Sequence, residues 1–98
     1  MSSENEFLLQ RLISSEIKTD LLTLFHRNPG LVDTIKGIAL RIGRSDAEVA
    51  GDVKDFLELG LLTKRTLGKT KVEVIQLNRW RDREIQASLE RYVSGLKR

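Results

Sequence analysis

The chain has 98 residues, of which 40% are hydrophobic and 32% charged, and its formal net charge is +3. This length matches a single domain, and the composition is ordinary for a soluble globular protein. The absence of cysteine excludes disulfides, thiolate nucleophiles and thiolate zinc ligands. Because the chain has no long apolar run and no signal-peptide pattern, we expect a cytoplasmic protein without a membrane anchor.

The first 30 residues have apolar side chains at helical spacing. The pattern begins with Phe7 and Leu8 and continues through a second apolar stripe at residues 17–25. Two serines at positions 14 and 15 either break one helix or cap a second one, so one long helix and two shorter helices both remain open. His26 lies near the end of this segment, where we expect it to interact with the last helical carbonyl groups.

Two short helices with a tight turn between them are predicted next. Asp33 is the expected N-cap of the first, and its buried stripe consists of Ile35, Ile38, Ala39 and Ile42. Gly43 is expected to end this helix in the left-handed conformation, and Ser45 caps the second helix, at 46–59. Since only Gly43 and Arg44 separate the two, the pattern predicts a helix-turn-helix.

A β-hairpin with glycine at its tip follows the second helix. Leu61 and Leu62 begin the outgoing strand, and Gly68 marks the turn. The return strand is indicated by Val72, Val74 and Leu77, although Ile75 interrupts the alternation. A very short strand at Leu31 and Val32 is also compatible with the sequence.

The last predicted helix covers residues 79–97 and is capped by Asn78. Its apolar face has no place in a minimal domain formed by the preceding elements. Trp80 is expected to anchor this helix onto the core, with stacking on a nucleic-acid base as the alternative.

The order of elements from Leu31 to Leu77 resembles the winged helix-turn-helix domain, most families of which bind duplex DNA. The resemblance covers residues 16–77, and the chain is similar to small dimeric transcriptional regulators of the ArsR and MarR types. It implies a mainly α fold with a small β-hairpin wing (α+β), as one domain over residues 1–98 with additional helices at 3–14 and 79–97. It also implies a DNA-binding transcriptional regulator that acts as a homodimer on two half-sites, without catalysis.

The two terminal helices are surplus to the minimal winged helix domain. Such apolar helices usually form a dimer interface, because their exposure to water is unfavourable. The predicted interface residues are Phe7, Leu8, Ile85, Leu89, Tyr92 and Leu96. The alternative is that the two helices pack on each other within one chain.

The resemblance assigns DNA contacts to two groups of residues. The wing residues are Lys64, Arg65, Lys69 and Lys71, which are suited to phosphates. The residues in the turn and the second helix are Arg41, Arg44, Ser45, Ala47 and Lys54. The plainer interpretation of the wing is a solubilising hairpin whose charges protect an edge strand.

The acidity of the helix at 46–59 opposes this assignment. Its carboxylates are Asp46, Glu48, Asp52, Asp55 and Glu58. Steps of about 100° per residue predict an outward face of Ala47, Glu48, Gly51, Lys54, Asp55 and Glu58. Carboxylates on this face would be repelled by a phosphate backbone.

The sequence contains no motif for catalysis or metal binding. It has one histidine and no cysteine, and no glycine-rich phosphate loop or nucleophile motif can be assembled. We therefore expect no enzyme activity, no cofactor and no metal. The alternative function is a winged-helix module that binds a basic protein through the acidic helix at 46–59 in a larger assembly. RNA binding through the basic surfaces is a third hypothesis.

Overall fold

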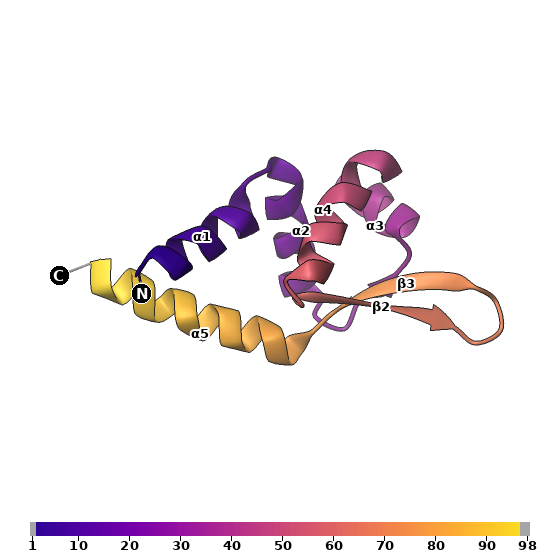
Figure 1. Ribbon diagram of the computed structural model, residues 1–98. Helices are drawn as coiled ribbons and strands as arrows, with labels where there is room; N and C mark the ends of the chain where they lie inside the picture. Colours follow the sequence, from indigo (N-terminus) through magenta and orange to yellow (C-terminus); the bar gives the residue numbers. More distant parts are fainter. Residues whose placement is uncertain (1, 97–98) are drawn as a thin grey trace.

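The computed structural model describes the backbone of residues 2–96 and the side chains of residues 6–95. It has the predicted α+β winged helix fold, with five helices and a three-stranded antiparallel sheet among the described residues (Figure 1). The elements are α1 (Ser2–Ile13), α2 (Glu16–Arg27), β1 (Val32–Asp33), α3 (Ile35–Ile42), α4 (Asp46–Glu58), β2 (Leu62–Leu67), β3 (Val72–Leu77) and α5 (Arg79–Leu96). The predicted end of the last helix at residue 97 lies outside the described residues.

The N-terminal segment forms two helices rather than one. Ser15 is extended (φ −146°), and its hydroxyl accepts a hydrogen bond from the backbone N–H of Lys18 at 3.0 Å. This N-cap satisfies one of the free N–H groups at the start of α2. The helical pattern is therefore interrupted at the pair of serines.

The helix-turn-helix is present as predicted, with one correction at its start. Gly43 has φ 70°, and Ser45 caps α4. The N-cap of α3 is Thr34 and not Asp33, since the Thr34 hydroxyl accepts from the N–H of Gly37 at 3.0 Å. Asp33 is in β1, and its carboxylate accepts from the N–H of Thr34 at 2.8 Å. The prediction missed this because two adjacent residues are both good caps.

A second left-handed glycine directs the chain from α4 into the hairpin. Gly60 has φ 77°, and its N–H donates to the carbonyl of Leu57 at 3.0 Å. The N–H of Leu61 donates to the carbonyl of Phe56, also at 3.0 Å. These two bonds form a Schellman motif, which ends the helix where the sequence predicted.

The sheet has the order β1-β3-β2. Leu62 pairs with Leu77 and Lys64 with Ile75, so these residues share the face that packs against the helices. Val72 and Val74 lie on the opposite face. The return strand that Val72, Val74 and Leu77 indicated is thus present as β3, and its alternation toward the helices runs through Ile75 and Leu77.

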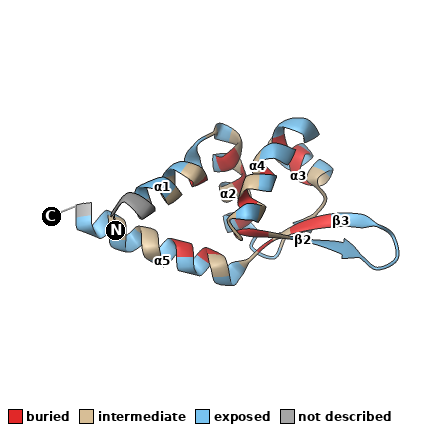
Figure 2. Ribbon diagram, viewed as in Figure 1, coloured by how far each residue is buried: buried red, intermediate tan, exposed pale blue. Residues whose placement is uncertain are grey.

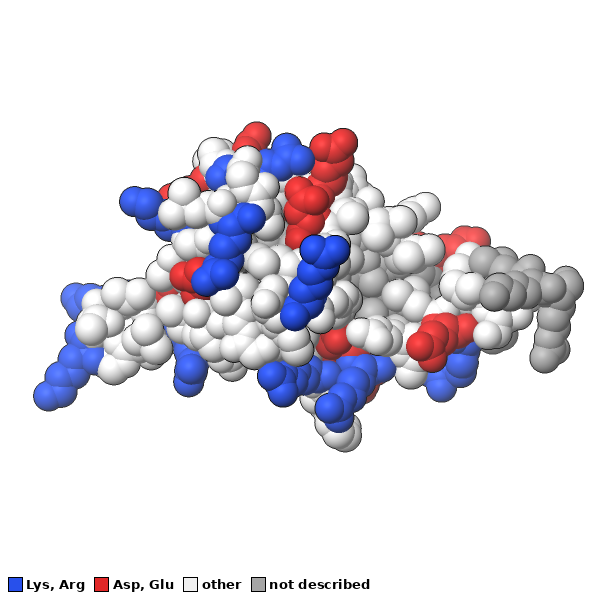
Figure 3. Space-filling model, turned by 180° about the vertical axis from the view of Figure 1, so that it is seen from behind, with Lys and Arg blue, Asp and Glu red and all other residues white. Residues whose placement is uncertain are grey.

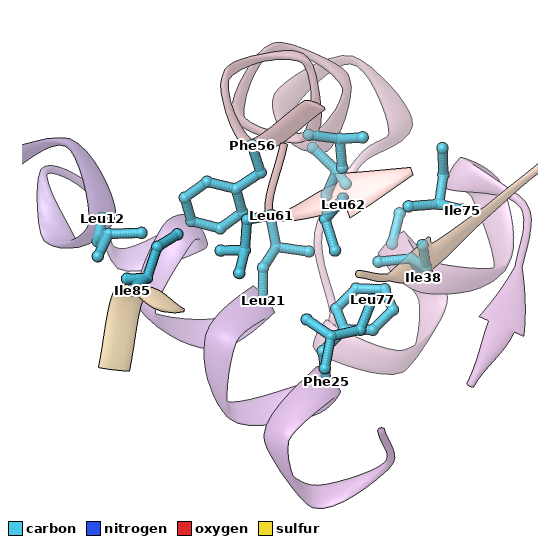
Figure 4. Close-up of a cluster of buried hydrophobic side chains, with 13 residues drawn as sticks. Leu12, Leu21, Phe25, Ile38, Phe56, Leu61, Leu62, Ile75, Leu77 and Ile85 are labelled. Carbon is cyan, nitrogen blue, oxygen red and sulfur yellow. The ribbon is translucent and has the colours of Figure 1, made fainter. Parts of the chain in front are cut away.

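The core lies where α2, α3 and α4 meet the sheet (Figure 4). Its largest fully buried side chains are Phe25, Phe56, Leu21, Ile38, Leu61, Ile75, Val49 and Val53. Figure 2 shows that the buried residues end well before the hairpin tip, which is exposed on all sides. The hairpin therefore projects from a packed helical body.

The terminal helices project in the direction opposite to the hairpin, which gives an elongated molecule of 52 × 24 × 21 Å (Figure 1). Leu12 of α1 and Ile85 of α5 lie together at the edge of the core (Figure 4). Farther out, the Tyr92 hydroxyl donates to Glu6 at 3.0 Å. The two terminal helices thus contact each other within one chain.

Candidate nucleic-acid interface

Helix α4 has two different edges along its length. Val49, Val53 and Phe56 are buried, and a rotation of about 100° per residue divides the remaining positions between two sides. One side faces α2 and carries Asp52 and Asp55. The other side faces the hairpin and carries Ala50, Lys54 and Leu57. Opposite the buried stripe, the helix exposes Ala47, Gly51 and Glu58.

Most carboxylates of α4 are held by groups on the helical body. Nζ of Lys18 lies 2.9 Å from Asp55 Oδ2 and 3.9 Å from Asp52 Oδ1. The Ser15 hydroxyl donates to Asp52 at 2.8 Å. The hydrogen bond from Lys18 holds the pKa of Asp55 below its ordinary value. The Asp55 side chain is still 41% exposed, but its carboxylate is directed toward Lys18 of α2.

Two further carboxylates also have partners within the chain. Glu48 accepts from the backbone N–H of Ser45 at 3.1 Å, and the Ser45 hydroxyl accepts from the N–H of Glu48 at 3.3 Å. This capping box lowers the pKa of Glu48, chiefly through the backbone N–H and then through the hydroxyl. Glu58 lies 4.0 Å from Arg11. Four of the five carboxylates of α4 thus have partners within the chain, while Asp46, Glu48 and Glu58 remain exposed.

A groove of about 530 Å³ lies between α4, the start of α3 and the hairpin. Ala50, Lys54 and Leu57 line it from α4, while Lys36 lines it from α3 and Lys64 from β2. No carboxylate of α4 lines this groove. Its one carboxylate, Glu73 on β3, is 3.2 Å from Lys64. The groove therefore combines three lysines with apolar side chains such as Ala50, Leu57 and Ile75.

Lys36 is a groove residue that the sequence pattern did not single out. It follows Ile35 in α3, next to the buried stripe of that helix. Its place on the side facing α4 and the hairpin depends on how the three elements pack. In the sequence, only its position in the first turn of the helix-turn-helix could have indicated that Lys36 belongs to this surface.

The four predicted wing cations do not share one surface. Strand pairing puts Lys64 on the face that carries Ile75, and Arg65 on the face that carries Val74. Lys69 and Lys71 belong to the turn that joins the strands. Period-two alternation therefore directs Lys64 into the groove and Arg65 away from it.

The two arginines predicted near the turn are engaged in ion pairs. Nε of Arg41 donates to Asp33 Oδ2 at 3.0 Å. The Arg44 guanidinium lies 3.2 Å from Glu16 and 3.6 Å from Asp20 on α2. These contacts direct both side chains toward acidic groups of the chain itself.

Basic side chains also gather elsewhere on the surface. Figure 3 shows Lys and Arg at the projecting hairpin and along the lower edge of that view, where α5 begins. Acidic side chains on the helical body lie beside basic ones in the same view. On this face, basic side chains therefore gather at the hairpin and at the start of α5.

The predicted interface residues of the terminal helices have very different exposures. Phe7 is 63% exposed, while Leu8, Leu89 and Tyr92 are half-buried. Ile85 is 3% exposed and belongs to the core of its own chain, so it is not open to a second protomer. The side chain of Leu96 lies outside the described residues. Val93, which the prediction did not include, is 44% exposed.

Two predictions about aromatic residues outside the groove are wrong. Trp80 is 73% exposed and does not anchor α5. The buried Ile85 packs α5 onto the core instead. Because the two residues lie about 140° apart around the helix, they cannot both face the core. Nε2 of His26 lies 2.9 Å from Oδ1 of Asp82 on α5, and His26 does not cap α2. This contact forms because α5, which is distant in sequence, lies against the C-terminal end of α2.

No helix within residues 2–96 combines the length and hydrophobicity needed to cross a bilayer. In the same part of the chain, no three His, Cys, Asp or Glu side chains are grouped so that they could hold a metal ion.

Comparison with known proteins supports the fold. No protein-family model matches the chain, and no curated protein matches it in sequence. Among solved structures, the chain is similar to a possible transcriptional regulator from Methanosarcina mazei Go1, with a TM-score of 0.61 and 16% sequence identity. The similarity covers 94% of this chain and 85% of the other. The chain therefore has a fold that is also found in a protein described as a possible regulator.

Proposed function

We propose that this protein is a non-catalytic transcriptional regulator, similar to the ArsR and MarR types, that binds duplex DNA through the groove face of α4 and the hairpin. The observation that carries the proposal is the absence of α4 carboxylates from the lysine-lined groove. The acidity of the helix opposed DNA binding only if its carboxylates faced outward. With Asp52 and Asp55 held by Lys18, the hairpin side of α4 is open to an anionic surface.

The hairpin adds charge beside this groove. Lys69 and Lys71 at the turn have no ion pair within the described residues, so both are available to phosphates. Each phosphate that a lysine neutralises releases condensed counterions, which makes binding weaken as salt increases. The proposal also entails a cytoplasmic location with the DNA.

The direct test is a fluorescence-anisotropy titration of the protein against random duplex DNA at two salt concentrations. We expect binding that weakens steeply between about 50 and 200 mM salt. No binding at about 50 mM salt would contradict the proposal. That result would favour the alternative, a protein-interaction module acting through α4. Preference for single-stranded RNA over duplex DNA in the same titration would favour the RNA hypothesis.

We further propose that the terminal helices form a homodimer interface centred on Phe7 and Val93. Both side chains are apolar and exposed on helices that project from the helical body (Figure 1). A second copy would remove them from water and bring two DNA-contacting surfaces to one duplex. In this arrangement α1 and α5 pack both within and between protomers.

The dimer is tested by sedimentation equilibrium of the unmodified chain and of Phe7→Asp and Val93→Asp variants. We expect a dimer mass for the former and a monomer mass for both variants, because each carboxylate would be buried without a partner. Val72→Asp is the matched control, since Val72 is also exposed but lies on the hairpin. A monomer mass for the unmodified chain would refute the dimer and leave the DNA proposal standing.

A further inference from the structure

The residues that α4 presents toward the groove limit what the protein can recognise in DNA. We infer that it binds duplex DNA with little discrimination between sequences, so that its ligand is general duplex DNA and not one operator. This inference rests on the proposed function and concerns the same surface. It follows from the side chains that α4 exposes on its hairpin side and opposite its buried stripe, which are Ala47, Ala50, Gly51, Lys54 and Glu58. Of these, the Glu58 carboxylate is repelled by phosphates.

Direct recognition of bases needs side chains that match their hydrogen-bonding groups. Arginine or lysine pairs with guanine, and asparagine or glutamine with adenine, through polar groups that reach into the major groove. Ala47 and Ala50 have only methyl groups, which can touch the methyl of thymine, and Gly51 has no side chain. Lys54 is therefore the one long hydrogen-bond donor on this edge.

The neighbouring hydroxyl groups are held by the helix ends. The Ser45 hydroxyl accepts from the N–H of Glu48 at 3.3 Å, and that of Thr34 accepts from the N–H of Gly37 at 3.0 Å. Both side chains thus lie against the backbone of their own helices. Asp46 in the first turn of α4 is exposed, but a carboxylate there is repelled by nearby phosphates.

The groups that favour binding are instead positive charges around the groove. Lys36, Lys54 and Lys64 line it, and Lys69 and Lys71 extend the basic surface along the hairpin turn. Phosphate contacts position a protein on the duplex but carry no sequence information. Small residues on α4 also let its backbone come close to the DNA. Binding of this kind is strong at low salt and nearly independent of sequence.

The experiment is selection by the full chain from a pool of randomised duplexes, followed by anisotropy competition between the most enriched duplex and random DNA. We expect a preference below about 100-fold, compared with roughly 10³–10⁷-fold for specific binders. An enriched motif with a preference above about 10³-fold would overturn the inference while supporting the proposed function. Absence of binding to any duplex would refute both.

A variant that adds a base-reading group tests whether α4 faces the bases. Ala47→Arg should acquire a preference for guanine-containing sites of about 10-fold or more, equivalent to at least about 1.4 kcal/mol. Ala87→Arg is the matched control, because Ala87 is also exposed but lies on α5. We expect this control to bind all duplexes slightly more tightly and to gain no preference. If the two variants behave alike, α4 does not enter the groove of the DNA, and the inference fails.

Discussion

The Nζ atom of Lys18 on α2 lies 2.9 Å from Oδ2 of Asp55 on α4. Lys18 is only 5% exposed, and its ammonium group also donates to the Ser14 hydroxyl at 3.0 Å. A buried lysine needs such partners, because an unpaired charge away from water is costly. This contact both fastens α2 to α4 and keeps acidic charge away from the groove.

Replacement of Lys18 by methionine should destabilise the fold. The change keeps most of the side-chain volume but leaves the carboxylates of Asp52 and Asp55 without their cation. We expect the free energy of unfolding to fall by about 1–3 kcal/mol, as measured by urea denaturation. Lys69→Met is the matched control, because this exposed lysine should change stability by less than about 0.5 kcal/mol. Equal effects of both substitutions would show that the contact is not stabilising.

The same contact should make stability depend on pH. The pKa of Asp55 is lowered in the folded state by the hydrogen bond from Lys18, so unfolding is accompanied by proton uptake at acid pH. The stabilisation is fully present above the ordinary aspartate pKa of about 3.9 and is lost as the pH falls through the lower folded-state value. The stability difference between the unmodified chain and Lys18→Met should therefore shrink from pH 6 to about pH 3. If the stability difference between the unmodified chain and Lys18→Met stays constant over this range, the assignment is contradicted. The stability difference between the unmodified chain and Lys69→Met, measured over the same pH range, is the control.

Trp80 and Ile85 should respond in opposite ways to truncation. Trp80→Ala removes a large side chain that is mostly in water, so we expect a stability change within about 0.5 kcal/mol. Ile85→Ala leaves a cavity at the edge of the core and should cost about 2–4 kcal/mol. Both values come from denaturant titrations followed by circular dichroism, which does not depend on the single tryptophan. A larger loss for Trp80→Ala than for Ile85→Ala would show that Trp80 anchors α5 after all.

Lys64 and Arg65 are adjacent in sequence but lie on opposite faces of the hairpin. Lys64→Ala should weaken binding to random duplex DNA and reduce the slope of log affinity against log salt by about 0.9. Arg65→Ala should leave this slope nearly unchanged, although it removes the same charge. Replacement of all four hairpin cations should therefore reduce the slope by up to about 2.7 and not 3.6. Equal effects of the two single variants would place the DNA along both faces of the hairpin.

The sequence was most informative where a local backbone requirement selects the residue. Gly43 and Gly60 both adopt positive φ, and each ends a helix where only the permissive backbone of glycine is favourable. Ser45 forms the capping box with Glu48, a motif that is visible at a spacing of three residues. Signals of this kind predicted the helix-turn-helix, the hairpin and hence the fold class.

The candidate site was less predictable because it depends on which way side chains face. The sequence showed that α4 is acidic, but not that Lys18, far away in the chain, draws Asp52 and Asp55 to the α2 side. Trp80 was expected to anchor α5 onto the core, but its position on the helix leaves it 73% exposed.

The sequence alone therefore determined the helix-turn-helix, the hairpin and the winged helix fold, because caps, glycines and apolar spacing act over a few residues. Tertiary structure decided the partners of Lys18 and His26 and the division of Lys64 from Arg65. It also decided that three lysines and no carboxylate of α4 line the groove. These features depend on strand register and on contacts between elements distant in the chain. Such contacts are not encoded by any local pattern in the sequence.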